Sequence, residues 1–266
     1  MSGVSGVTNA VREFFSVAGA VAQRQVRRAF TNASFFLPSL FPVFFFVAFA
    51  GGLTRVGEVP GFDFPAGYEA FQYVWVLLQA VTFGGAFTGF AIAGDFETGF
   101  ARRLLLAAHQ RGGIILGYVL ASFVRVAVTG ALVTVAALLV GMQVGGGPVD
   151  MAGLLGLALT LNVSATLFAT GIALRIRTSQ GGPLIQTPLF LLLFLAPVFV
   201  PLSLLEGWIH AVASVNPVTF LLEAGRGFIA GNPTGVLPAF AVGLTAAALL
   251  ALWAVTGLRR AERSGN

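Results

Sequence analysis

The 266-residue sequence contains no cysteine and no lysine, and it has only two histidines, His109 and His210. The absence of cysteine excludes disulfides, a thiolate nucleophile and cysteine-ligated zinc. Two histidines are too few for a multi-histidine metal site within one chain. A Walker A loop needs a lysine to hold the β- and γ-phosphates, so the chain does not hydrolyse ATP by that route.

Charge is also scarce, because only 9% of the residues are charged whereas 57% are hydrophobic. A soluble domain carries about a quarter charged residues, and a disordered chain needs low hydrophobicity and high net charge. Phenylalanine occurs 26 times, and the mean hydropathy is +0.90. The composition therefore predicts an integral membrane protein.

Six apolar segments are long enough to cross the hydrocarbon core, where every backbone polar group must be paired internally. These segments are residues 35–53, 70–93, 114–142, 151–174, 184–202 and 236–258. Prolines interrupt the first and the fifth segments, and membrane helices tolerate such kinks when neighbouring helices satisfy the freed carbonyls. We predict an all-α integral membrane fold with six transmembrane helices.

The arginines indicate how the chain is oriented, because arginine-rich loops face the cytoplasm. Those outside the spans gather before the first span, between the second and third, between the fourth and fifth, and after the sixth. They are Arg12, Arg24, Arg27, Arg28, Arg102, Arg103, Arg111, Arg175, Arg177, Arg259, Arg260 and Arg263. The opposite loops hold only Arg55 and Arg226. We therefore predict that both termini are cytoplasmic.

Residues 9–30 form a predicted amphipathic helix. Apolar residues recur at the spacing of one helix face, and basic and polar residues occupy the other face. A basic amphipathic helix beside a span usually lies in the plane of the headgroups. The helix either anchors the chain passively or offers a docking surface to a cytoplasmic partner, and the two roles are compatible.

The link between the second and third spans, residues 94–106, mixes acidic, basic and apolar side chains. Gly99 would weaken a helix interior, whereas residues 100–108 are good helix formers. The pattern predicts a turn followed by a short cytoplasmic helix. An ordinary positively charged loop is the alternative.

Residues 203–232, between the fifth and sixth spans, are too polar to span the membrane and too apolar for a solvated loop. We predict two short helices that break at Asn216-Pro217 and dip into the outer leaflet as a re-entrant hairpin. Glu223 and Arg226 are spaced to form an ion pair. The alternative is an amphipathic cap that does not contact the transported molecule.

Two motifs resemble the membrane subunit of type-2 ATP-binding-cassette exporters, and most closely the daunorubicin-resistance, drug-export branch. The first is Asn-Pro-Val-Thr-Phe at residues 216–220, followed by Glu-Ala-Gly-Arg at 223–226. The second is Glu-Thr-Gly at residues 97–99, followed by Arg-Leu-Leu at 103–105 and by Arg111. The family commonly has a proline before this last arginine, where the present chain has residues 108–110.

The resemblance implies one transmembrane domain, residues 1–266, that pairs with a second copy or a sister permease. Two separate ATPase subunits, which carry ATP and Mg²⁺, would bind on the cytoplasmic side, and this chain itself would bind no cofactor and no nucleic acid. Residues expected to couple the ATPase to the spans are Arg24, Arg27, Arg28, Asp95, Glu97, Gly99, Arg102, Arg103, Leu104 and Arg111. The motif expected in the outer hairpin comprises Asn216, Pro217, Glu223 and Arg226.

Arg125 lies inside the third span, where a charge is costly and usually faces protein or a watery cavity. Either its side chain extends to the cytoplasmic headgroups or it lines the inner mouth of a transport pathway. Gly85 and Gly89, and Gly113 and Gly117, are spaced for close helix contact.

The preferred function is a non-enzymatic permease subunit that exports a hydrophobic or amphipathic small molecule. Export of a lipid, glycolipid or polysaccharide by the same architecture is the alternative. A self-contained secondary transporter is disfavoured because no span has a central acidic residue. A membrane enzyme is disfavoured because Asp63, Asp95 and Asp150 fall on opposite sides of the predicted membrane.

Overall fold

The computed structural model describes residues 2–31, 36–108 and 110–263, and within these ranges the chain is helical with no strand. The α-helices are α1 (Ser2–Thr31), α2 (Phe36–Gly52), α3 (Gly67–Glu97), α4 (Phe100–Ala107), α5 (Gly112–Val140), α6 (Pro148–Ile176), α7 (Gly182–Phe194), α8 (Gly207–Val215), α9 (Pro217–Ala230) and α10 (Val236–Arg263). Single 3₁₀ turns, η2 (Thr54–Glu58), η3 (Ser179–Gly181) and η4 (Leu202–Leu204), join some of them. Phe35 and His109 lie outside the described residues.

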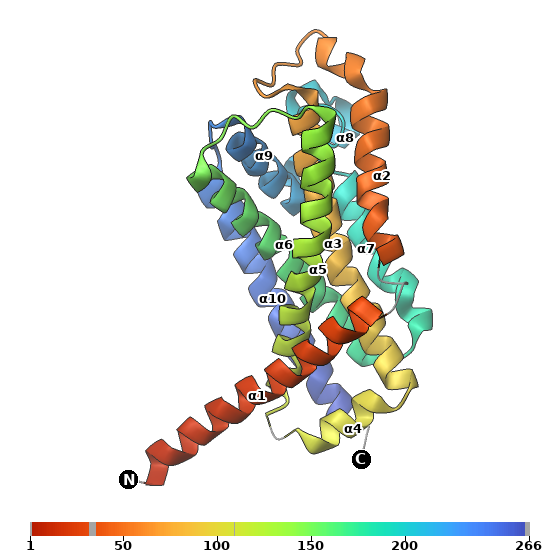
Figure 1. Ribbon diagram of the computed structural model, residues 1–266, viewed down its shortest axis with the longest axis vertical. Coiled ribbons are helices and arrows are strands. Elements are labelled where there is room, and N and C mark those ends of the chain that lie inside the picture. Colours follow the sequence, from red (N-terminus) through yellow and green to blue (C-terminus); the bar gives the residue numbers. More distant parts are fainter. Residues whose placement is uncertain (1, 32–35, 109, 264–266) are drawn as a thin grey trace.

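Helix α3 is the centre of the bundle, and most of its side chains are buried by the helices around it. Within the described residues, α3, α5, α6 and α10 are long and apolar enough to cross a membrane, whereas α2 and α7 are shorter. Both chain ends lie at the end of the bundle that carries α1 and α4, while α8 and α9 lie at the opposite end (Figure 1). We call these the α4 end and the α9 end.

The paired glycines bring helices into contact, as their spacing predicts. A Cβ on Gly85 would lie 2.6 Å from the backbone nitrogen of Thr166, so α3 and α6 touch through bare backbone. A Cβ on Gly117 would lie 2.6 Å from the Cβ of Val21, so α1 lies equally close to α5. Small residues at such contacts favour packing of membrane helices.

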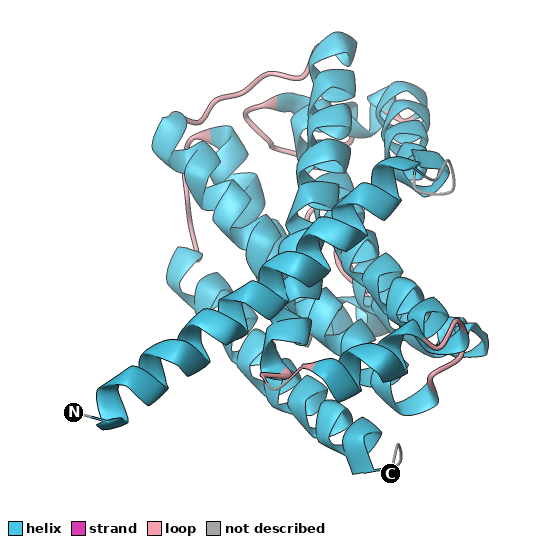
Figure 2. Cartoon of the chain, turned by 60° about the horizontal axis from the view of Figure 1, so that its bottom comes forward, coloured by secondary structure: helices cyan, strands magenta, loops and turns pink. Residues whose placement is uncertain are grey.

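The amphipathic helix is confirmed, and α1 is longer than the predicted 9–30 because it begins at Ser2. It crosses the α4 end of the bundle obliquely, and its first part extends beyond the other helices (Figure 2). Ala18 and Val21 are buried against α5, whereas Val11 and Phe15 remain exposed. One side of helix α1 therefore packs against α5, and another side leaves apolar side chains exposed.

The fifth predicted span differs most from the structure. Helix α7 ends at Phe194 instead of continuing through residue 202, and an irregular segment and η4 follow. Pro197 and Pro201 explain the early end, because proline lacks an N–H and disfavours helical conformation in the preceding residue. At the α9 end, the predicted break is confirmed: α8 ends at Val215 and α9 begins at Pro217.

Candidate functional site

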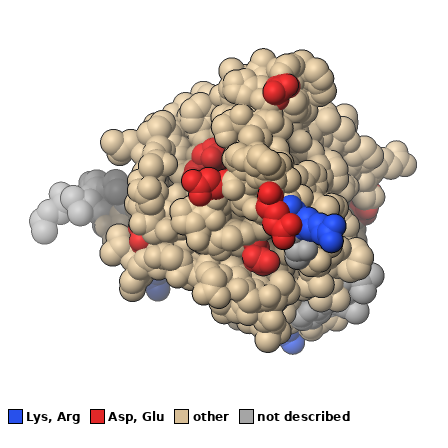
Figure 3. All heavy atoms as spheres, turned by 90° about the horizontal axis from the view of Figure 1, so that it is seen from above, with Lys and Arg blue, Asp and Glu red and all other residues tan. Residues whose placement is uncertain are grey.

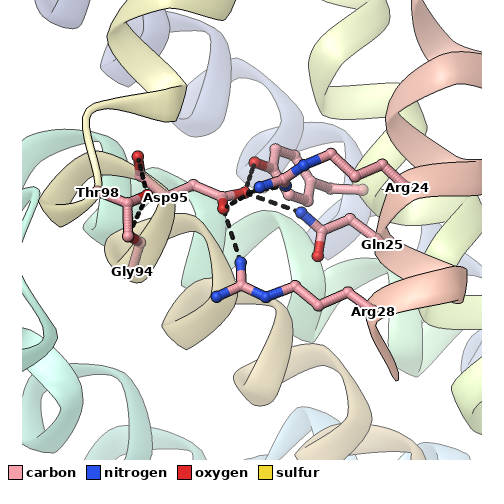
Figure 4. Close-up of polar contacts among 7 residues, drawn as sticks. Arg24, Gln25, Arg28, Gly94, Asp95 and Thr98 are labelled. Atoms are coloured by element: carbon pink, nitrogen blue, oxygen red, sulfur yellow. Dashed lines mark hydrogen bonds and ion pairs between the residues drawn. The ribbon is translucent and has the colours of Figure 1, made fainter. Parts of the chain in front are cut away.

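Asp95 is the centre of a polar cluster at the α4 end (Figure 4). Its side chain is fully buried in the last turns of α3. Arg24 donates from both terminal nitrogens to the two carboxylate oxygens, each at 3.0 Å. Arg28 adds a hydrogen bond of 2.8 Å to Oδ1. One buried carboxylate thus holds two arginines of α1, one of them in the bidentate geometry that gives strong pairs.

Two neutral donors complete the cluster. Gln25 of α1 donates to Oδ2 of Asp95 at 2.8 Å, and the hydroxyl of Tyr118 in α5 donates to the same oxygen at 2.9 Å. Both side chains are buried. Because a buried charge is tolerated only when it is paired and hydrogen-bonded, these donors make the position of Asp95 stable. We call Arg24, Gln25, Arg28, Asp95 and Tyr118 the Asp95 cluster.

The α1 side of the Asp95 cluster follows from local helix geometry. Residues 24 and 25 each lie about one turn before residue 28, so all three share one face of α1. The Gly113 and Gly117 contacts hold that helix against α5. The guanidinium of Arg24 also lies 3.5 Å from the ring centroid of Phe100 in α4. Helices α1, α3, α4 and α5 therefore meet at this one cluster.

The predicted link began at Gly94, and this boundary is wrong because α3 continues to Glu97. Because the helix continues for one more turn, the side chain of Asp95 points into the bundle. In the predicted loop it would have faced solvent. The turn at Gly99 is confirmed by its φ of 72°, a value that favours glycine, and α4 follows at Phe100 as predicted.

Glu97, the last residue of α3, joins the link to the connection between α6 and α7. Its Oε1 accepts hydrogen bonds from the backbone N–H of Ser179 at 2.8 Å, the hydroxyl of Ser179 at 2.7 Å and the hydroxyl of Thr178 at 3.0 Å. These bonds, chiefly the backbone one, lower the pKa of Glu97 below the usual value for glutamate. Hydrogen bonds thus link the end of α3 to the connection between α6 and α7 at the α4 end.

The other residues predicted to couple to an ATPase lie around this cluster with different exposure. Arg27, Arg102 and Arg103 are exposed, whereas Leu104 is half-buried in the apolar cluster beneath α4. Arg111 forms an ion pair of 3.3 Å with Glu262 near the end of α10. The α4 end therefore has exposed arginines on the surface of helices that are linked to one another by the Asp95 cluster.

Sequence reasoning placed Arg175 only as one of many basic loop residues and missed its contacts. Its Nη2 donates to the carbonyl of Trp253 at 3.0 Å and to the hydroxyl of Thr256 at 2.8 Å. Its guanidinium lies 3.5 Å from the centroid of the Trp253 ring. The residue ties α6 to α10, and the tryptophan 78 positions later gave no local signal for this pairing.

Arg125 reaches sideways between helices. Its Nη1 donates to the carbonyl oxygen of Gly84 in α3 at 3.1 Å, and it lines a water-sized hollow with Gln25, Thr88 and Tyr118. Gly84 and Arg125 lie at similar distances along their helices from the α4 end. The side chain of Arg125 is thus bonded to α3 within the protein, and its place at the inner mouth of a transport pathway stays a prediction.

A second polar cluster lies at the α9 end. Arg226 is buried; its Nη1 donates to Glu223 at 2.8 Å and its Nη2 to the carbonyl of Val198 at 3.2 Å. Its guanidinium stacks 3.3 Å from the centroid of the Phe71 ring in α3. The predicted Glu223–Arg226 pair is confirmed, and we call these four residues the Arg226 cluster.

Asn216 and Pro217 start α9. The side-chain oxygen of Asn216 accepts from the backbone N–H of Val218 at 2.9 Å, an N-cap bond, and Pro217 occupies the first helical position, which favours proline. The amide of Asn216 also donates to the carbonyl of Leu192 in α7 at 2.7 Å. Asn216 thus caps α9 and also links it to α7.

The α9 end carries few charges on its surface, and most of them are acidic (Figure 3). Exposed residues of this kind are Glu58, Asp63 and Glu206, with Arg55 nearby in sequence. The α4 end holds the arginines described above. A bundle of long apolar helices with this charge asymmetry and an amphipathic helix docked at its basic end defines a helical membrane protein of the polytopic class.

The comparisons with known proteins identify the family. The model of the ABC-2 type transporter family matches residues 16–229, which is most of the chain, and the chain therefore belongs to this family. Members are permease subunits of ABC transporters and work with an ATP-binding subunit.

Two relatives have names that refer to drug resistance. The chain is 25% identical over 200 residues to the daunorubicin resistance ABC transporter permease protein DrrB1 of Streptomyces coeruleorubidus, an alignment of 74% of this chain and 67% of the relative. It is 25% identical over 162 residues to the probable doxorubicin resistance ABC transporter permease protein DrrC of Mycobacterium tuberculosis H37Rv. That second alignment covers 59% of this chain and 57% of the relative, so the chain spans little more than half the length of DrrC.

Proposed function

We propose that this chain is the permease subunit of an exporter that moves a hydrophobic or amphipathic small molecule outward across the cytoplasmic membrane. A separate ATPase subunit would bind and hydrolyse ATP with Mg²⁺. Two copies of the permease, or this chain and a sister permease, would form the pathway. The drug-resistance names of the two relatives support this type of cargo.

The Asp95 cluster is the observation that carries the proposal. It connects α1 and α4, which lie at the surface of the α4 end, to α3, the central helix of the bundle. A subunit docked on α1 and α4 would therefore move α3 through a charged, hydrogen-bonded joint and not through a flexible loop. The exposed arginines Arg27, Arg102 and Arg103 would contact the acidic surface of that subunit.

The orientation follows from the same asymmetry, because arginine-rich connections remain in the cytoplasm. Helices α2 and α7 would complete six passes, with the segment after Phe194 and the α8–α9 hairpin forming the outer closure. None of the six predicted spans has a central acidic residue. This feature favours ATP-driven export over secondary transport.

Co-purification tests the proposal. The tagged chain is expressed with the ABC ATPase encoded nearest to its gene, and ATP hydrolysis by the purified complex is titrated with daunorubicin and with a phospholipid. We expect a stable complex whose ATPase rate depends on the drug. Stimulation by the lipid alone would favour the lipid-export alternative, and transport by the isolated chain without ATP would overturn the proposal.

A matched pair of variants locates the docking surface. Arg102→Glu reverses an exposed charge on α4, and Arg55→Glu reverses an exposed charge at the α9 end. We expect Arg102→Glu to reduce the yield of the complex and Arg55→Glu to leave it unchanged. Equal yields for the two variants would contradict docking at the α4 end.

A further inference from the structure

A cavity of about 180 Å³ lies between α7 and α10, away from both polar clusters. Helix α6 and the first turns of α9 also line it, and α3 contributes Thr82. On α10 the lining runs from Val242 to Leu250, and on α6 from Leu161 to Phe168, which are the middle parts of two predicted spans. The cavity therefore lies near the middle of the membrane.

The walls of this cavity offer almost nothing to a polar ligand. Its two hydroxyl-bearing residues are both bound to their own helices: Thr82 donates to the carbonyl of Leu78 at 2.7 Å, and Ser164 donates to that of Thr160 at 3.0 Å. A water molecule needs two to four polar partners, so an apolar cavity of this kind stays dry. A dry cavity of roughly 150 Å³ can hold benzene, so this one can hold a hydrocarbon group of similar size.

Small residues and a short helix produce the space. Gly243 and Ala246 are the small residues of α10 that line it, and Pro188 lies in α7 on the opposite side. Gly243 is already pressed against α6, because a Cβ there would lie 2.8 Å from Cγ2 of Thr160. Helix α10 therefore cannot close the cavity by moving further towards α6.

The surroundings determine what fills this space. Leu191 of α7 and Leu249 and Leu252 of α10 are exposed on the helices that border the cavity, and they do not line it. At mid-membrane depth the medium that covers such side chains is lipid hydrocarbon. An apolar, partly open cavity at this depth is therefore in contact with acyl chains and not with water.

We propose that the cavity is a binding site for a segment of one acyl chain of a membrane lipid, inserted between α7 and α10. The chain packs against Leu189 and Leu192 on one side and against Ala246 on the other, beneath Pro217 and Val218 of α9. Because Asn216 joins α9 to the carbonyl of Leu192, a bound chain supports both the short helix α7 and the start of the hairpin. This inference depends on the membrane setting and not on the cargo.

Photolabelling in nanodiscs tests the site. The full chain, purified and reconstituted with phosphatidylcholine that carries a diazirine in the middle of one acyl chain, is irradiated, and its adducts are mapped by mass spectrometry. We expect adducts at Leu189 and Leu192 to exceed those at Leu132 and Leu139, which are exposed apolar residues of α5 outside the cavity.

A matched pair of substitutions on α10 makes the test specific. Ala246→Phe fills the cavity, whereas Ala248→Phe adds the same group to an exposed position two residues further along. We expect Ala246→Phe to reduce adducts at Leu189 and Leu192 by about tenfold, equivalent to ~1.4 kcal/mol of lost affinity. Ala248→Phe should leave them unchanged.

Ala246→Leu is a smaller change that is less prone to cause misfolding. We expect it to reduce the adducts less than Ala246→Phe does. In size-exclusion chromatography it should elute at the same volume as the unmodified protein. Equal labelling of all variants, or labelling no stronger than on α5, would overturn the proposal. Loss of adducts when daunorubicin is added in excess would also overturn it, because the cavity would then belong to the cargo.

Discussion

At the α4 end an anion is buried and its partners are partly exposed, whereas at the α9 end a cation is buried and its partner is partly exposed. The side chain of Asp95 is 0% exposed while those of Arg24 and Arg28 are 34% and 46% exposed. The side chain of Arg226 is 3% exposed, and that of Glu223 is 41% exposed. Both clusters hold the central helix α3, but they connect it to different parts of the chain.

The difference lies in what each cluster can transmit. The Asp95 cluster joins α3 to α1 and α4, helices at the surface where a partner subunit would dock. The Arg226 cluster joins α3 to α9 and to the segment after α7, both of which belong to the proposed outer closure. We infer that the Asp95 cluster would transmit movement and that the Arg226 cluster would keep the α8–α9 hairpin in place.

The largest effect is expected for Asp95→Ala. The substitution leaves two arginines, Gln25 and Tyr118 without their shared acceptor, and breaking a buried ion pair from one side costs about 3–5 kcal/mol. Because both arginines retain access to solvent, we expect a loss near the lower limit of that range. Thermal unfolding of the purified chain in detergent measures it, and a melting temperature unchanged from the wild type would contradict the assigned role.

Arg226→Met should cost less, about 2 kcal/mol, because a hydrogen bond to a charged group contributes about 1.5–3 kcal/mol. The Glu223 left behind is partly exposed and can be hydrated, and methionine retains an apolar contact with Phe71. The same unfolding assay compares the two clusters. A loss larger than that of Asp95→Ala would reverse the order of the comparison.

Asn216→Ala removes the N-cap of α9 and the bond to Leu192, and we expect a loss of about 1–2 kcal/mol. Asn232→Ala is a matched control, because Asn232 is also followed by proline and is exposed at the end of α9. Hydrogen exchange at the first turn of α9 should rise in Asn216→Ala alone. Equal exchange in both variants would remove the role of the cap.

The smallest effect is expected for Arg111→Gln at the α4 end. The Arg111–Glu262 pair is only partly buried, and exposed ion pairs contribute roughly 0–1 kcal/mol. We expect a change in melting temperature that disappears in high salt. A salt-independent loss comparable to that of Asp95→Ala would show that the stability of this end does not depend chiefly on the Asp95 cluster.

Local sequence signals were sufficient wherever a single residue determines the backbone. Gly99 marked the turn before α4, and Asn216-Pro217 marked the break between α8 and α9, since both depend on the conformational preferences of these residues. The spacing of small residues likewise indicated close helix contacts at Gly85, Gly89, Gly113 and Gly117, but the partner helices, α6 for α3 and α1 for α5, come from the structure. The amphipathic pattern predicted α1 for the same reason, because helix periodicity is a local property.

Long-range polar contacts were not predictable in this way. The sequence places Asp95 and Glu97 two residues apart in one charged link, yet one is buried and the other exposed, because α3 continues for one more turn. The pairing of Arg175 with Trp253 depends on how α6 crosses α10, which no local pattern encodes. Apolarity alone also overestimated the fifth span, where Pro197 ended the helix.

Export per ATP hydrolysed, measured in proteoliposomes that hold the complex of this chain with its ATPase subunit, tests the central claim most directly. The comparison uses the isosteric Asp95→Asn beside Arg226→Met, with size-exclusion chromatography to confirm that both complexes assemble. The account predicts that Asp95→Asn hydrolyses ATP but exports much less cargo per ATP, whereas Arg226→Met keeps the wild-type ratio. An unchanged ratio in Asp95→Asn would contradict it.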